Sequence, residues 1–107
     1  MQVTFTTTQN APLYAGATEV FAALGIMLTN PATGVTGPWD LTAGSASMLM
    51  TPPTGNPTFA LSGVISTNNV TFTRWTATPG EWSRREIFSD STGFTQLTEP
   101  FPFTVQE

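Results

Sequence analysis

The sequence predicts an all-β protein, an antiparallel β-sandwich of about seven strands in two sheets. Three observations indicate this fold class. Threonine is abundant and, with valine, isoleucine and phenylalanine, favours extended backbone over helix. Short segments alternate apolar and polar residues, as strands with one buried face do. Between these segments lie clusters of glycine, proline, asparagine, aspartate and serine, the residues that form turns.

The alternation is clearest near the N-terminus, where QVTFTTT places Val3, Phe5 and Thr7 on one face. The segments TFALSGVIS and PFPFTVQE repeat the pattern, and turn clusters such as NPATGVTGP, TPPTGNP and SDSTG separate the apolar runs. The prolines of the last segment predict a break at Pro100 or Pro102 and an edge position, because proline cannot donate to a strand ladder. We therefore expect strands at residues 2–8, 17–28, 45–51, 58–65, 69–76, 81–88 and 94–105.

One segment leaves an alternative open. Residues 17–25, ATEVFAALG, contain good helix formers and are the only stretch with helical spacing. We favour a long buried strand over residues 17–28, bent at Gly25, and keep a helix over 17–25 as the alternative.

Length and composition limit the possible functions. The 107 residues suit one domain, 1–107, and the net charge of −4 arises from seven carboxylates and three arginines without any lysine. Nucleic-acid binding needs clustered cations, so we do not expect it. The longest apolar run, Val20 to Leu28, is far shorter than the ~20 residues of a membrane helix, and no export signal precedes it. We expect a soluble protein that binds no membrane.

Residue types needed for much catalysis are absent. The chain has no cysteine and no histidine, which removes thiolate sites, the commonest metal ligand and the commonest general base. A pair of carboxylates could still hydrolyse a glycoside, but Glu81 and Glu86 are five residues apart and face opposite sides of a strand. The SDSTG segment has too few acids for a calcium loop, so we expect Asp90 to cap backbone N–H groups in a turn. We expect no catalytic residue, no cofactor and no metal.

The order of signals after residue 14 resembles a known family. A strand follows a glycine turn in YAGATEVFAALGIMLTN, a strand with paired methionines follows GPWDLTAGS, and a P-G-aromatic strand and an Asp-x-x-Gly turn follow in TPGEWSRREIFSDSTG. Together these features are similar to the immunoglobulin-like N-terminal domain of phage baseplate upper proteins and to related small modules of tailed-phage virions, over about residues 14–105. The matching positions are Asp40-Leu41-Thr42, Pro79-Gly80 with Trp82, and Asp90, Gly93, Phe101 and Val105.

This resemblance implies an immunoglobulin-like fold and a structural role in a virion. The sequence departs from the family at Ala17, where the family has an acidic residue, and it ends at Glu107 without the extension that a fibre adaptor needs. We therefore expect a capsid decoration or cement protein on the particle surface, assembled in the host cytoplasm. A tail or baseplate accessory domain is the alternative. The partners are other virion proteins, the major capsid protein or tail proteins, and the chain itself is a possible homo-oligomer.

The residues best suited to such contacts are Trp39 and a cluster of tryptophans and arginines between positions 74 and 85. Tryptophan and arginine are the types most enriched at binding hot spots. They are equally suited to the interior, where one tryptophan fills the core and the arginines pair with Glu81 or Glu86. A third possibility is a carbohydrate-binding adhesion module in which exposed tryptophans stack on sugars, although we favour Trp39 as an anchor of its loop onto the core. The candidate protein-interface residues are Trp39, Arg74, Trp75, Trp82, Arg84 and Arg85.

Overall fold

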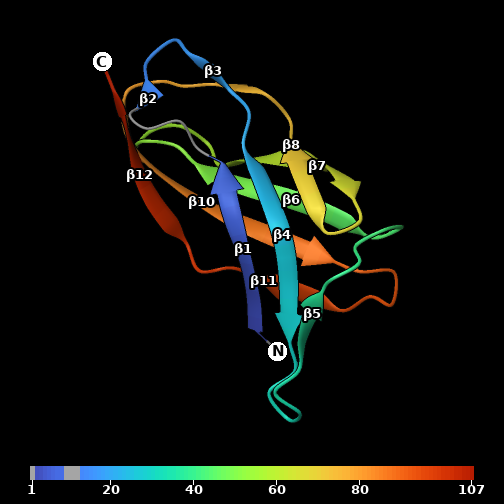
Figure 1. Cartoon of the computed structure of the whole chain (residues 1–107). Helices are drawn as coiled ribbons and strands as arrows, with labels where there is room; N and C mark the ends of the chain where they lie inside the picture. The colour runs from blue at the N-terminus through green and yellow to red at the C-terminus, as the bar shows by residue number, and fades with distance from the viewer. Residues whose placement is uncertain (1, 9–12) are drawn as a thin grey trace.

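The computed structural model of the chain describes residues 2–8 and 13–107, and over these residues the fold is all-β, with strands and turns but no helix (Figure 1). No helix that could cross a bilayer occurs in this part of the chain. The strands are β1 (Gln2–Thr8), β2 (Leu13–Tyr14), β3 (Thr18–Glu19), β4 (Ala22–Thr29), β5 (Thr36–Pro38), β6 (Ser45–Thr51), β7 (Phe59–Ser66), β8 (Asn69–Phe72), β9 (Trp75–Thr76), β10 (Gly80–Ser89), β11 (Thr95–Leu97) and β12 (Phe101–Gln106).

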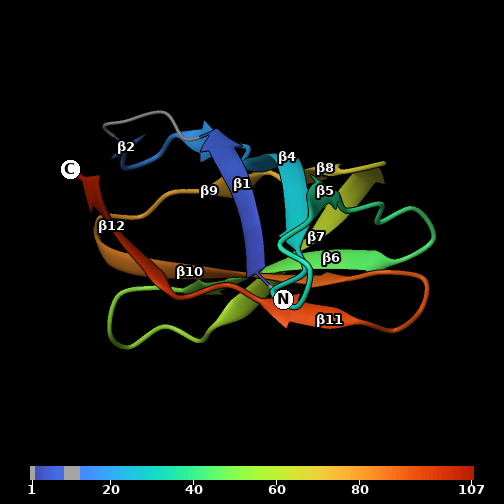
Figure 2. The ribbon, with the colours of Figure 1, turned by 60° about the horizontal axis from the view of Figure 1, so that its bottom comes forward.

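Most of these strands belong to one curled sheet with the order β1-β4-β8-β7-β6-β10-β12-β2. Strand β5 adds to β4, β11 adds to β10, and β3 with β9 forms a separate two-stranded sheet. The pairs are antiparallel except β12 with β2, which is parallel. Figure 2 shows that the curl brings β1, β4 and β8 over β6 and β10, so that two layers face each other.

The two layers meet at β7, which pairs with β8 on one side and with β6 on the other. Gly63 lies at this corner. A Cβ at this position would lie 2.5 Å from Val70 Cγ1 and 3.0 Å from the Ala46 carbonyl oxygen. Only glycine therefore lets the neighbouring strands approach this closely without a shift.

The expected strand at 17–28 is divided at Val20 and Phe21 into β3 and β4, and β4 itself contains a β-bulge. Between the pairs Thr4↔Met27 and Thr6↔Leu24, β4 has one residue more than β1, and Gly25 adopts a left-handed φ of 61°. The β7–β8 turn holds this bulge, because the Gly25 N–H donates to Asn69 Oδ1 at 2.9 Å and the Ile26 N–H to the Asn68 carbonyl at 2.9 Å. The bend predicted at Gly25 is present, and the helix considered over 17–25 is not.

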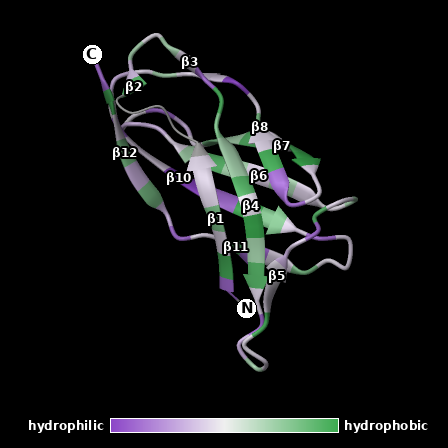
Figure 3. Ribbon diagram, viewed as in Figure 1, coloured by the Kyte–Doolittle hydropathy of each residue, from purple (hydrophilic) through white to green (hydrophobic). Residues whose placement is uncertain are grey.

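The interior between the layers is rich in aromatic side chains. Phe5 of β1 meets Phe88 of β10 edge to face, with ring centroids 5.5 Å apart, and so joins the two layers. Toward the other end, the ring centroids of Trp75 and Trp82 lie 4.8 Å apart, and Trp82 stacks on Phe103 at an interplanar angle of 18°. Figure 3 shows hydrophobic residues along β4, β6, β8 and β12, the strands that enclose this core.

The remaining boundaries show which strands sequence patterns locate well. Strands β1 and β6 have the predicted bounds, and β7 and β10 differ from the prediction by one residue at each end. The segment 69–76 divides at Thr73 and Arg74 into β8 and β9. The segment 94–105 divides over residues 98–100 into β11 and β12, and this break includes Pro100, as predicted. The short strands β2 and β5 were not predicted, whereas β3 lies within the strand expected over 17–28. The described part thus contains more strands than the seven expected.

Candidate docking face and buried ion pair

Strand β10 places its side chains alternately inside and outside the fold. Its burial alternates with a period of two, so that Arg84 points into the space between the layers and Arg85 points away from it. The inner row consists of Trp82, Arg84, Glu86 and Phe88, all buried. The expectation that the adjacent arginines face opposite sides is confirmed.

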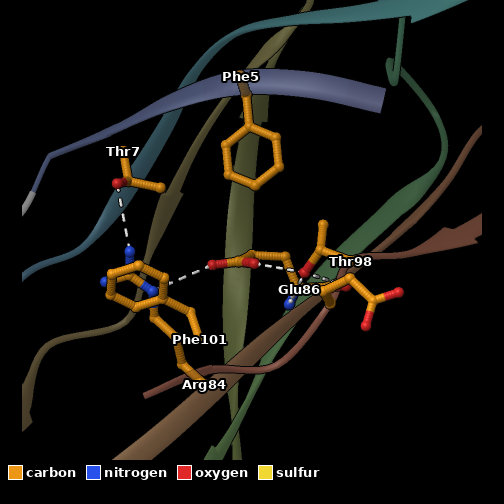
Figure 4. A pocket seen from close by; sticks show the side chains of 7 residues that line it. Phe5, Thr7, Arg84, Glu86, Thr98 and Phe101 are labelled. Carbon is orange, nitrogen blue, oxygen red and sulfur yellow. Dashed lines mark hydrogen bonds and ion pairs between the residues drawn. The ribbon is translucent and has the colours of Figure 1, made fainter. Parts of the chain in front are cut away.

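Arg84 and Glu86 form an ion pair in the interior, with 3.4 Å between Nε and Oε1. Arg84 is only 3% exposed. Its Nη2 donates to Thr7 Oγ1 at 3.2 Å, while Thr98 Oγ1 donates to Glu86 Oε2 at 2.6 Å. Figure 4 shows this chain of contacts. It links β1, β10 and the segment between β11 and β12, so both charges act to hold elements of the fold together.

Aromatic rings surround the guanidinium group. The Cζ atom of Arg84 lies 4.7 Å from the ring centroid of Phe101 and 5.0 Å from that of Phe21, distances at which a cation is attracted to the ring face. Burial lowers the pKa of Arg84, and the charge of Glu86 opposes this shift. Since arginine is not deprotonated in proteins, the side chain remains a cation.

A pocket of about 170 Å³ lies above the ion pair, between β1 and β12. Phe5 and Thr7 of β1 form one wall, Phe101 of β12 another, and Glu99 lies exposed at the rim. The Glu86 carboxylate is engaged with Arg84 and Thr98, which suits a structural charge and not a general base waiting for a substrate.

A second pocket, of about 270 Å³, lies below the β6–β7 loop. Pro52, Pro57, Phe59 and Trp82 form its apolar lining, and Asn56, Thr76 and Thr78 supply polar groups. The indole N–H of Trp82 already donates to the Thr78 carbonyl at 2.8 Å.

The outer row of β10 forms part of a broad sheet surface. Strand register places Arg85 opposite Leu49 of β6, Leu49 opposite Ala60 of β7, and Ile87 opposite Leu97 of β11. Leu97 is 53% exposed and Leu49 is 36% exposed. We call this set the docking face: Leu49, Ala60, Arg85, Ile87 and Leu97.

Arg85 is held in place on this face. Its Nε donates to the Thr98 carbonyl oxygen at 2.7 Å, which fixes the orientation of the guanidinium group. Serine and threonine occupy most of the surrounding positions, as in Ser47, Ser62 and Thr51. In Figure 2 this side of β6, β10 and β11 faces away from β1, β4 and β8.

Most of the predicted interface residues lie inside the molecule. Trp39 is 4% exposed, and Trp75 and Trp82 are each 5% exposed. They fill the core with Arg84, because the inner faces of a sandwich this small need large side chains. The idea of three exposed tryptophans that stack on sugars is therefore wrong. Of the six candidates, only Arg74, which is exposed, and Arg85, which is half-buried, reach the surface.

Asp90 organises the turn between β10 and β11, as predicted. Its Oδ1 accepts hydrogen bonds from the backbone N–H groups of Thr92 at 2.9 Å and Phe94 at 3.1 Å. Its Oδ2 accepts a hydrogen bond from the indole N–H of Trp39 at 3.0 Å, which joins the turn to a side chain of the core. These bonds, above all the hydroxyl of Thr92 and the indole of Trp39, lower the pKa of Asp90. No group of three His, Cys, Asp or Glu side chains able to hold a metal occurs among the described residues.

The apolar members of the docking face were not singled out from the sequence. Leu49, Ile87 and Leu97 come from three separate strands, and only their register brings them together. The alternation of residues along β10 was a signal that could have placed Arg84 inside, because Arg84 lies on the same face of the strand as Trp82 and Phe88.

Comparisons of the chain with known proteins identified no similar protein. The chain matches no protein-family model, no curated protein and no solved structure.

Proposed function

We propose that this chain is an immunoglobulin-like β-sandwich module of a tailed-phage virion, a small capsid decoration or cement protein that binds other virion proteins and performs no chemistry. The docking face is the observation that supports this proposal most. It joins apolar side chains of three strands around one fixed arginine, and it carries little other charge. Protein interfaces have this composition, with an apolar centre, arginine enriched and other charges depleted.

The state of the polar groups in the interior also favours a binding role over a catalytic one. Arg84 contacts Thr7 of β1 and Glu86 contacts Thr98 beyond β11, so both charged groups stabilise the fold. A hydrolytic site needs an acid and a base placed to reach a substrate. The chemistry-bearing residues of β10 instead hold the two layers together.

A decoration protein can work with modest contacts. Each copy contributes one face, and a lattice of repeated partners supplies many such contacts at high effective concentration. A face built on Arg85, Ile87 and Leu97 is suited to this mode because its side chains lie on paired strands of one sheet.

Two other roles remain alternatives. A tail or baseplate accessory domain would use the same docking face, and only the place of the chain on the particle separates it from a capsid role. Glycan binding would have to use the pocket beneath the β6–β7 loop, where Trp82 lies beside Asn56 and Thr78. We favour it less, because Trp82 is nearly covered and its indole N–H is already bonded.

Immunogold labelling of the parent particles with an antibody to this chain tests the proposal. Label on heads supports decoration, label on tails supports the accessory role, and particles without label refute both. Tagged variants expressed during particle assembly then test the face. Leu97→Glu should reduce incorporation at least tenfold, whereas Val35→Glu, an equally drastic change on a loop residue that is 64% exposed, should not.

A further inference from the structure

Strand β1 ends the sheet with an unprotected edge. It is seven residues long, and β4 pairs with one of its sides. Within residues 2–8 and 13–107, no strand pairs with its other side. Its sequence, QVTFTTT, contains neither a charge nor a proline. An edge strand of this kind is a template for pairing with another chain.

The other edges of the described sheet are protected. Strand β2 has two residues, and β5 and β11 have three each. Strand β12 is longer but contains Pro102, which cannot donate to a new partner. Short edge strands and prolines are the usual means of preventing association, so the exception at β1 needs an explanation.

The bulge beside β1 does not disturb its open edge. The extra residue at Gly25 belongs to β4, and β1 itself keeps a regular alternation, with Thr4 and Thr6 exposed and Val3 and Phe5 half-buried. The edge therefore remains straight enough to accept a partner strand over its full length.

We propose that two copies of this chain associate through their β1 strands, paired antiparallel across a twofold axis. Antiparallel pairing of one strand with its own copy is what such an axis produces, and both copies then use the same surface. A register centred on Phe5 places Phe5 opposite its copy and Val3 opposite Thr7, so the two phenylalanines meet and the half-buried side chains share one face.

Charge permits this pairing although each copy carries a net charge of −4. Like charges directly opposite each other destabilise a strand pair, and β1 contributes none. Across seven residues, the new ladder would add on the order of six backbone hydrogen bonds. A second copy can therefore provide hydrogen-bond partners for the free edge of β1, and no other protein with a matching sequence is required.

The proposed dimer does not depend on the virion role. Strand β1 lies in the layer opposite β10 and β11, so pairing through β1 leaves the docking face free (Figure 2). An experiment can therefore disprove the dimer of the purified chain without disproving binding to particles, and the reverse.

Sedimentation-velocity centrifugation of the purified chain, from micromolar to millimolar concentration, tests the proposal. We expect a reversible dimer with twice the 11.4 kDa mass of one chain. The double variant Thr4→Lys/Thr6→Lys places four cations around the axis and should weaken the dimer at least a hundredfold. Thr71→Lys, at an exposed position of the interior strand β8, should leave it intact.

Circular dichroism must show the same β spectrum for all three proteins, and hydrogen exchange locates the contact. In the wild-type chain, amides of β1 should become more protected as concentration rises, and in the double variant they should not. A chain that stays monomeric throughout the concentration range overturns the proposal. So does a dimer that survives both lysines.

Discussion

Replacing Glu86 by glutamine removes the charge that faces Arg84 and keeps nearly the whole volume of the side chain. Glutamine can still accept the hydrogen bond from Thr98, so the variant isolates the electrostatic part of the contact. The guanidinium group would remain 3% exposed and charged, without its counter-ion at 3.4 Å. Breaking one side of a buried ion pair in this way costs about 3–5 kcal/mol.

The expected loss lies near the lower limit of that range. The rings of Phe21 and Phe101 still attract the cation, and such contacts contribute up to about 2 kcal/mol when water is excluded. We therefore predict that Glu86→Gln lowers the free energy of unfolding by about 3 kcal/mol. Adding Arg84→Met removes the unpaired charge, so the double variant should be more stable than Glu86→Gln alone.

Urea unfolding followed by tryptophan fluorescence measures these differences, because Trp75 and Trp82 lie in the same core. Glu99→Gln is the matched control. It makes the same change at the exposed rim of the same pocket, and we expect an effect below about 0.5 kcal/mol. Equal effects of Glu86→Gln and Glu99→Gln, or additive effects in the double variant, would refute the role assigned to the ion pair.

Three further changes test other parts of the fold. Gly63→Ala should cost about 1–3 kcal/mol in urea unfolding, because its Cβ collides with the strands at the corner, whereas Gly37→Ala, which has open space, should cost much less; equal losses would contradict the close packing. The hydroxyl of Thr92 helps to hold the pKa of Asp90 below its usual value, so this charge stabilises the fold above the unfolded-state pKa of about 3.9 and loses that effect as the pH falls through the folded-state pKa. Acid unfolding of Asp90→Asn should therefore depend less steeply on pH below about 4 than that of the wild type, and parallel curves would count against the assignment. Thr67→Asn should raise the melting temperature through a gain of about 0.5–1 kcal/mol, because Thr67 has a left-handed φ of 55° that asparagine tolerates better; no gain would argue against strain at this turn.

The sequence was sufficient to predict the all-β class and the position of several strands. Alternation located β1 and β6, where mostly apolar residues on one face alternate with mostly polar residues on the other. It failed where pairing with neighbours decides the outcome. Thr73 and Arg74 read as a continuation of β8, yet the chain leaves the sheet there and Trp75 turns into the core beside Phe21.

The candidate site was predictable only in part. The opposite orientation of Arg84 and Arg85 followed from their adjacency, and the capping role of Asp90 followed from the turn sequence. Whether a tryptophan is buried in the core or exposed depends on which face of its strand points to the other layer. The composition of the sequence does not give that orientation. The docking face depends on the register between β6, β10 and β11, which the alternation within a single strand does not reveal.

Electron cryomicroscopy of the parent particle tests the central proposal most directly. The account predicts density for this chain on the particle surface, with Arg85, Ile87 and Leu97 against another virion protein. Density in which that side of β10 and β11 faces solvent, or particles that contain no copy of the chain, would contradict it.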